Sequence, residues 1–209
     1  IRALAARARC AGEATLFFSM GGHAALCREY FEEALAVARR LDDDALMISA
    51  QGNAYLVLTH PSEARRRREL ADEMLARSER MDDDDARCEA LHFVFSVQVQ
   101  FCDPMIRTSF VHQRMLAQQL GPGRRWMAEY QASCLDYLSG RLDDALVVAA
   151  GWIEDAPVSR SRALTAYTMV ALVVRLAQGR GDELTDQIDA VIAEHPRMPA
   201  WRAIAATSF

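Results

Sequence analysis

Two runs of aspartate are the residues in this chain whose type and spacing most readily suggest chemistry. Asp42–Asp44 and Asp82–Asp85 place three and four carboxylates next to one another, and clustered carboxylates can bind divalent cations. A catalytic motif of this kind on a helical enzyme also needs a further acid at a fixed offset, where Ala45 and Ala86 stand, and a second metal motif, which the sequence lacks. Aspartate also caps helix N-termini, so we predict that both runs are helix boundaries.

A cysteine and a histidine offer a second possible site. Cys88 and His92 stand at positions i and i+4, which share one face of a helix. Zinc takes three or four protein ligands, and no recognised spacing joins this pair to Cys102 or His112. Buried cysteine is common as a small apolar residue. We expect no metal and no cofactor, and we keep a helical enzyme or metal-binding domain with a site near Cys88 and His92 as the alternative.

The four consecutive arginines Arg65–Arg68 could bind phosphate or an acidic partner. Consecutive residues point to different sides of a helix, however, and do not form one stripe. Nearby acids partly neutralise the run: Glu63, Glu69, Asp72 and Glu73. We therefore predict a solvated, ion-paired face. Because no phosphate-binding G-x-x-x-x-G-K-[ST], hydrolase G-x-S-x-G or zinc H-E-x-x-H motif occurs either, we predict no catalytic residues and no enzymatic activity.

Composition narrows the classes of partner and the compartment. The net charge of −5 weighs against a nucleic-acid-binding protein, although all 24 basic residues are arginine. The five cysteines form no C-x-x-C pair, which indicates reduced thiols and a cytoplasmic location. No apolar run is long enough to cross a membrane, and the arginine-rich first 18 residues do not fit a signal peptide. The first residue, Ile1, is not methionine, which suggests a piece of a larger protein.

The elements that must position these residues are helices that repeat. Glu32–Ala45 reads EEALAVARRLDDDA and Asp72–Ala86 reads DEMLARSERMDDDDA, which are offset by forty positions. A period of this size indicates a solenoid of helix pairs, in which each unit buries its apolar face on the next. Helical apolar spacing and Gly, Pro and Asp punctuation predict helices at about 1–20, 24–41, 44–58, 61–81, 86–101, 104–120, 124–138, 142–155, 158–178, 183–194 and from 201.

We therefore predict an all-α fold with about 10–11 helices. Short connections between the helices favour antiparallel packing of neighbours. The expected architecture is an α-solenoid of antiparallel helix pairs, forming a right-handed superhelix. The expected domain is a single one over residues 1–209.

The segment from Arg124 to Pro157 resembles a tetratricopeptide repeat. Gly140, Ala145 and Pro157 match the family's glycine, small-residue and closing-proline positions, whereas Glu129 and Ala132-Ser133 stand at its Trp and Leu-Gly positions. An earlier copy has Gly52 and Tyr55 at the small and aromatic positions, which become His92 and Phe95 forty residues later.

A broader resemblance covers most of the chain. ALAVARRLDDDAL, ELADEMLARSERMDDDDAR, SGRLDDAL and EHPRMPAWRA, in this order, are similar to the helical region of bacterial STAND-type ATPase regulators linked to LuxR-type DNA-binding or nucleotide cyclase domains. The resemblance implies a regulatory sensor module that takes part in signal transduction and transcriptional regulation. Its expected partners are a protein or peptide, a small-molecule effector, or the ATPase and output domains of its own polypeptide. Direct nucleic-acid binding and membrane binding by this part are not expected, and a homodimer is allowed.

In tetratricopeptide arrays the first helix of each pair lines the inner, concave surface. The Gly52 and Gly140 registers place six residues of this chain there: Asn53, Glu89, Phe93, Tyr130, Cys134 and Tyr137. Exposed aromatic residues at such positions would form a partner-binding site. The other interpretation is that Phe93, Tyr130 and Tyr137 pack between repeats, as residues of solenoid cores do.

Overall fold

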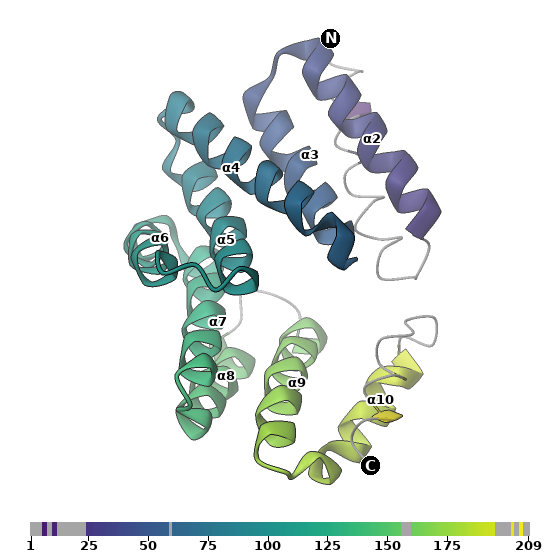
Figure 1. Cartoon of the computed structure of the whole chain (residues 1–209), viewed down its shortest axis with the longest axis vertical. Helices are drawn as coiled ribbons and strands as arrows, with labels where there is room; N and C mark the ends of the chain where they lie inside the picture. The colour runs from purple at the N-terminus through teal and green to yellow at the C-terminus, as the bar shows by residue number, and fades with distance from the viewer. Residues whose placement is uncertain are drawn as a thin grey trace. The chain divides into compact units, whose positions relative to one another are not determined.

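The computed structural model of the chain describes residues 24–58, 60–155 and 160–194, together with residues 6–7, 10–11, 202 and 205–206. Its described elements are all helical (Figure 1), and no strand occurs within these ranges. This confirms the predicted all-α class. The predicted helices at 1–20 and from Trp201 lie almost entirely outside the described residues. None of the described helices is long and apolar enough to cross a membrane.

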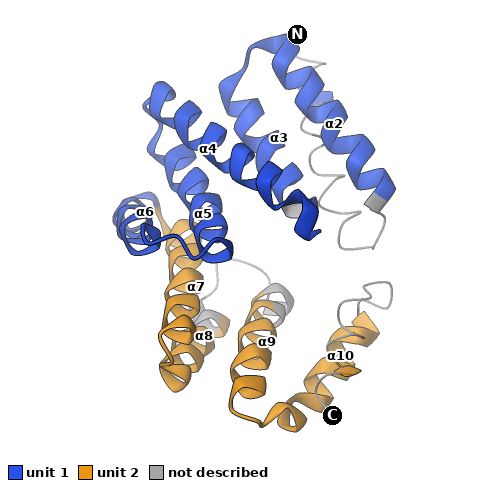
Figure 2. Cartoon of the chain, viewed as in Figure 1, with its two compact units in different colours: residues 1–120 blue, residues 121–209 orange. Residues whose placement is uncertain are grey.

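The chain divides into two compact units, residues 1–120 and residues 121–209 (Figure 2). Each unit is described below by itself. The first contains α2 (Ala24–Leu41), α3 (Asp44–Val57), a 3₁₀ turn (Pro61–Glu63), α4 (Ala64–Met81), α5 (Asp84–Gln100) and α6 (Ile106–Leu120). The second contains α7 (Pro122–Leu138), α8 (Leu142–Asp155), α9 (Arg160–Ala177), a 3₁₀ turn (Gly181–Leu184) and α10 (Thr185–Glu194).

The two aspartate runs form helix boundaries with the same backbone geometry, as the sequence predicts. Asp42 and Asp82 each adopt the left-handed conformation, with φ of 50° and 52°, which ends the preceding helix. The next aspartate then caps the following helix. The Asp43 carboxylate accepts a hydrogen bond from the Leu46 amide at 2.9 Å, and the Asp83 carboxylate accepts from the Asp85 and Ala86 amides at 2.9 and 3.0 Å. The forty-residue repeat is therefore a repeat of capping geometry.

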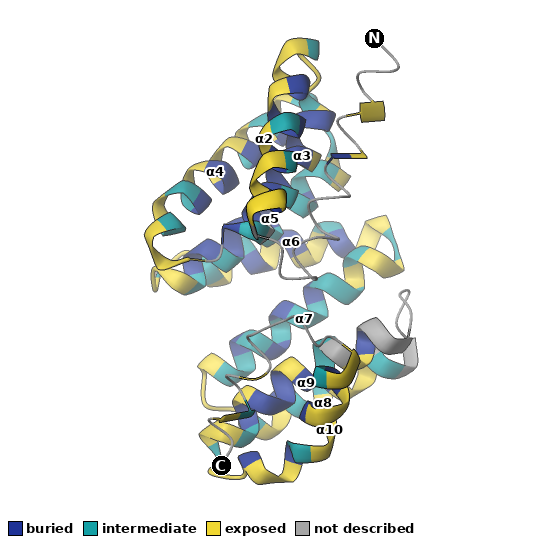
Figure 3. Ribbon diagram, turned by 90° about the vertical axis from the view of Figure 1, so that its right-hand side faces the viewer, coloured by how far each residue is buried: buried dark blue, intermediate teal, exposed yellow. Residues whose placement is uncertain are grey.

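In the first unit, each helix packs against the next one along the chain. α3 also packs against α5, whereas no Cα atom of α4 lies within 8 Å of one in α6. Each helix buries one face: Cys27, Phe31, Ala34 and Ala38 on α2 are buried, as are Leu70, Met74 and Ser78 on α4, while Leu41 and Met81 at the helix ends are partly buried. Figure 3 shows buried positions, in dark blue, along the helices of this unit. Two hydrophobic clusters result, one centred on α2 and α3 and the other on α3, α4 and α5.

In the second unit, α7 packs on α8 and α8 on α9, around a cluster of Ala145, Ala149, Val170 and Val174. α8 has the predicted bounds of 142–155. α7 begins at Pro122 rather than at the predicted Arg124. The reason is that Gly121, with φ of 125°, takes the N-cap position, and proline fits the first helical turn, where its missing N–H leaves no bond unmade.

Candidate binding groove between α4 and α6

Three of the predicted inner-surface residues belong to α3 and α5 of the first unit. Phe93 is buried, and its ring centroid lies 4.8 Å from that of Tyr55 and 5.2 Å from that of His92. Gly52 allows this approach, because a Cβ atom there would lie 3.1 Å from the Phe93 ring and 3.6 Å from the Glu89 carboxylate. Asn53 and Glu89 are half-buried. Phe93 therefore packs between α3 and α5, and the Glu89 carboxylate also lies close to Gly52.

The other three predicted residues lie on α7 in the second unit. Tyr130 and Tyr137 are partly buried against the Ala145 and Val170 cluster, and Cys134 is half-buried. Burial raises the pKa of Cys134 to about 11 and the pKa of Tyr130 to about 12. The six predicted residues thus fall into two groups, one in each unit, and within each group the aromatic side chains pack into a helix–helix contact.

Cys88 and His92 have different surroundings. The Cys88 thiol is buried and donates to the Gln113 carbonyl oxygen at 3.8 Å, which joins α5 to α6. His92 is half-buried and its ring meets the edge of Phe93. Cys102 is exposed in the connection before α6. Within the part of the chain that the structure describes, no group of three or more His, Cys, Asp or Glu side chains could hold a metal ion.

Three of the four arginines in the run are ion-paired, and the fourth, Arg67, is buried. Arg65 and Arg66 each lie 3.3 Å from the Glu69 carboxylate, and Arg68 lies 3.7 Å from that of Asp103. Arg67 is only 8% exposed, and its guanidinium lies 5.9 Å from the centre of the Tyr55 ring. The prediction of a solvated face is therefore wrong for Arg67, because four consecutive positions go round the helix and one of them must face the core.

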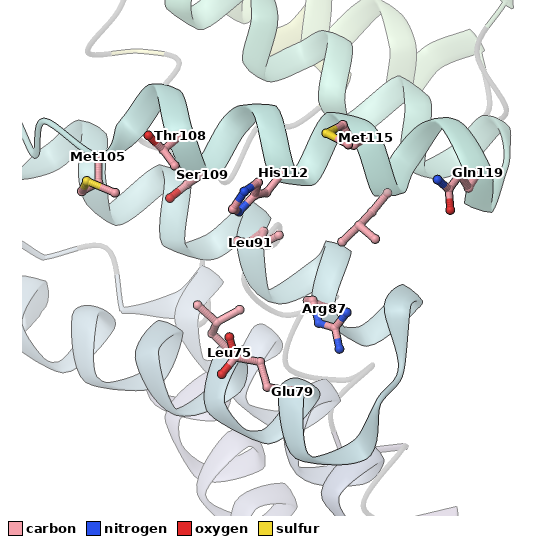
Figure 4. Close-up of a pocket in the computed structure, with 11 residues that line it drawn as sticks. Leu75, Glu79, Arg87, Leu91, Met105, Thr108, Ser109, His112, Met115 and Gln119 are labelled. Atoms are coloured by element: carbon pink, nitrogen blue, oxygen red, sulfur yellow. The ribbon is translucent and has the colours of Figure 1, made fainter.

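A groove opens on the side of the first unit where α4 and α6 stand apart, and α5 forms its floor (Figure 4). Its volume is about 450 Å³, within the range of small-ligand and side-chain pockets. Its lining residues are Leu75, Glu79, Arg87, Leu91, Met105, Thr108, Ser109, His112, Met115, Leu116 and Gln119.

α6 supplies most of this lining. One of its faces is buried within the unit, and another faces the groove. Phe110, Gln113 and Ala117 are buried at spacings of three and four, which matches one turn of a helix. Thr108, His112, Met115 and Gln119 follow the same spacings on the groove face. Met105 and Met115 are 52% and 58% exposed. Methionine is flexible and polarisable and adapts to varied apolar partners, so this face can hold an apolar group.

The charged groups of the groove lie on α4 and α5. The Arg87 guanidinium lies 2.7 Å from the Asp84 carboxylate and 3.5 Å from that of Asp82, so its charge is already paired. Among the described residues, neither the Glu79 carboxylate nor the His112 ring has a hydrogen-bond or ion-pair partner. The groove therefore combines apolar walls with one unpaired carboxylate and one unpaired imidazole.

Sequence reasoning missed this groove, although α6 carried a signal of it. A helix with one buried face needs one apolar stripe, whereas Met115 on α6 and Met105 just before it are exposed apolar residues outside the buried stripe. These residues were the sign of a second apolar surface.

With this geometry established, comparison with known proteins adds no relative: the sequence matches no family model, and neither the curated proteins nor the solved structures contain a significant match to it.

Proposed function

We propose that this chain is a non-enzymatic scaffold that binds a peptide or protein segment in the groove between α4 and α6. The groove itself is the observation that carries the proposal. It has a volume of about 450 Å³ and an apolar wall that includes two methionines more than half exposed. Contiguous exposed apolar surface of this kind is typical of interaction sites.

The proposed architecture is a solenoid of antiparallel helix pairs, and the helix contacts support it. In the first unit α3 packs on α5 while α4 and α6 stand apart, and in the second unit α7 packs on α9. If α3 and α5 are the first helices of their pairs in the first unit, and α7 and α9 in the second, the helix order within each unit fits the proposed solenoid. The repeated aspartate caps support the same register.

The resemblance to bacterial STAND-type regulators extends the proposal to the whole protein. The chain would then be the cytoplasmic sensor module of a multidomain regulator, and the bound segment would come from a partner protein or from the rest of its own polypeptide. The alternative site at Cys88 and His92 has less support, because the Cys88 thiol is buried and directed at the Gln113 carbonyl.

A peptide selection tests the proposal. A phage-displayed library of random peptides of about 12 residues, roughly three helical turns, is selected on the purified chain. The enriched peptides are then measured by fluorescence anisotropy against Ser109→Trp, which fills the groove, and Val111→Trp, which places the same indole on an exposed position of α6 outside the lining.

We expect the enriched peptides to bind the unmodified chain and Val111→Trp alike, and to lose about tenfold or more in affinity for Ser109→Trp. Met115→Glu, a change at an exposed position, serves as a second groove variant in case Ser109→Trp is poorly folded. Peptides that bind all four proteins equally, or a selection that enriches nothing, would contradict the proposal.

A further inference from the structure

We infer that the groove between α4 and α6 takes a cationic amphipathic segment, one apolar side chain of which enters the groove while an adjacent Lys or Arg faces the turn between α4 and α5. This inference rests on the proposed function and names the chemistry of the partner.

The apolar part of the occupant is set by the centre of the groove. Leu91 from α5, Leu75 from α4 and Leu116 from α6 line the groove together with the two more exposed methionines. In Figure 4 Leu75 and Leu91 lie between Met105 and Met115. Burying a leucine-sized side chain there contributes about 1.5–3 kcal/mol if it becomes fully buried. The hydroxyls of Thr108 and Ser109 and the His112 ring lie on the same wall and can bond to a peptide backbone.

The charged part is set by one end of the groove. Residues 79–87 contain five acidic side chains and two arginines, and they form the last turn of α4, the turn itself and the first turn of α5. The Asp82 side chain is 97% exposed. Arg87 is already paired with Asp82 and Asp84, whereas Glu79 lines the groove without an ion-pair partner among the described residues. A cation there meets an excess of negative charge, and a carboxylate would be repelled.

The opposite end gives the segment a direction. In Figure 4 Met105 and Thr108 lie toward one end of the groove, and Gln119 lies toward the other, on the side of Arg87. At the Met105 end, Asp103 accepts a hydrogen bond from the Met105 amide at 2.9 Å and faces Arg68 at 3.7 Å, so its charge is partly compensated. The bound segment should therefore lie along the groove in one direction only, with its cationic side chain at the Gln119 end.

Two labelled synthetic peptides of about 14 residues, roughly four helical turns, probe this inference. They share leucines at helical spacing and differ in their flanking positions, which are arginine in one peptide and glutamate in the other. Fluorescence anisotropy measures their binding to the unmodified chain, to Glu79→Lys, to Ser109→Trp, and to Glu32→Lys, which makes the same charge change at an exposed position of α2.

The expected result is that the Leu/Arg peptide binds the unmodified chain and Glu32→Lys equally. Its affinity falls about three- to tenfold for Glu79→Lys and more for Ser109→Trp, while the Leu/Glu peptide binds weakly to all. Raising NaCl from about 50 to about 300 mM weakens the Leu/Arg peptide, since the shorter Debye length screens the charges.

The two proposals fail in different ways. If the Leu/Glu peptide binds as well as the Leu/Arg peptide and Ser109→Trp abolishes both, the groove is a binding site but the cationic preference is wrong. If Glu79→Lys has no more effect than Glu32→Lys, the assigned charge contact is wrong. If Leu/Arg binding is unchanged by Ser109→Trp, it does not occur in the groove, and a selection that also fails removes the proposed function.

Discussion

At the scale of single residues, neighbouring side chains of the same type have opposite effects on the backbone. Asp82 holds a left-handed conformation that suits glycine better than aspartate, whereas Asp83 supplies a side-chain oxygen to two amides. The same pair of roles occurs at Asp42 and Asp43. Adjacent aspartates in each run therefore have different structural roles, one at the left-handed helix end and one at the N-cap, and single substitutions can separate them.

Asp82→Gly and Asp83→Ala are expected to change stability in opposite directions. Glycine adopts positive φ without steric cost, so Asp82→Gly should raise the free energy of unfolding by a few tenths of a kcal/mol to about 1 kcal/mol. Asp83→Ala removes the cap and should lower it by about 1 kcal/mol. Urea unfolding followed by circular dichroism measures both, and two changes of the same sign would show that the boundary is not held in this way.

Gly52 tests how closely α3 and α5 approach. Gly52→Ala gains up to about 1 kcal/mol of helix propensity, but its Cβ would lie 3.1 Å from the buried Phe93 ring, which Tyr55 confines from another side. Overpacking costs about 1–3 kcal/mol, so we expect a net loss of stability. Gly151→Ala is the matched control on α8, where nothing lies within 4 Å of the new Cβ, and there the propensity gain should appear alone.

The pH dependence of stability should report the burial on α7. The pKa of Cys134 is raised from 9.0 to about 11, so in the folded state the thiol keeps its proton where the unfolded chain has lost it. Its contribution to stability is complete below pH 9 and is lost as pH rises toward 11. Tyr130, with its pKa raised from 10.0 to about 12, extends the loss upward.

Cys134→Ser and Tyr130→Phe should therefore reduce the loss of stability above pH 9, measured by urea unfolding at a series of pH values under reducing conditions. Cys102→Ser changes an exposed thiol and should leave the slope unchanged. An unchanged slope in Cys134→Ser would mean that this thiol is not buried as described.

At the scale of helices, the signals that predicted the structure were local ones. Helix boundaries depend on caps and breakers that stand within a few residues of one another, so α2 and α8 begin and end as predicted. The start of α7 was misplaced by two residues because Gly121-Pro122 can end one helix or begin the next, and both uses involve the same residue types.

The groove could not be predicted in the same way, because it depends on which helices do not touch. Two helices that pack on the same third helix, as α4 and α6 pack on α5, can touch each other or stand apart. The spacing of apolar residues within each helix is the same in both cases. Arg67 is a similar case. It is buried because α4 turns this position toward Tyr55, and four consecutive arginines do not show which of them will face the core. Met105, just before α6, and Met115 on α6 were the apolar residues of the sequence that indicated this surface.

At the scale of the whole molecule, each compact unit has its own hydrophobic clusters, and among the residues that the structure describes those of the first unit involve none beyond Leu120. The division falls between the end of α6 and Gly121, whose positive φ precedes α7. Repeat proteins gain most of their stability from contacts between neighbouring helices rather than from distant ones. A cut at this point therefore leaves the contacts within the first unit intact.

We accordingly expect residues 1–120, produced alone, to be helical by far-UV circular dichroism and to unfold cooperatively in urea. The groove lies wholly within this fragment, so it should also bind the Leu/Arg peptide with an affinity within about threefold of the full chain, since remote contacts change binding only modestly when the site itself is preserved. A matched fragment, residues 1–100, lacks α6 and one wall of the groove, and it should lose the binding.

If residues 1–120 prove unfolded, the two units depend on one another for stability. If they fold but do not bind a peptide that the full chain binds, residues beyond Leu120 take part in the site, and the assignment of the groove to α4, α5 and α6 would have to be revised.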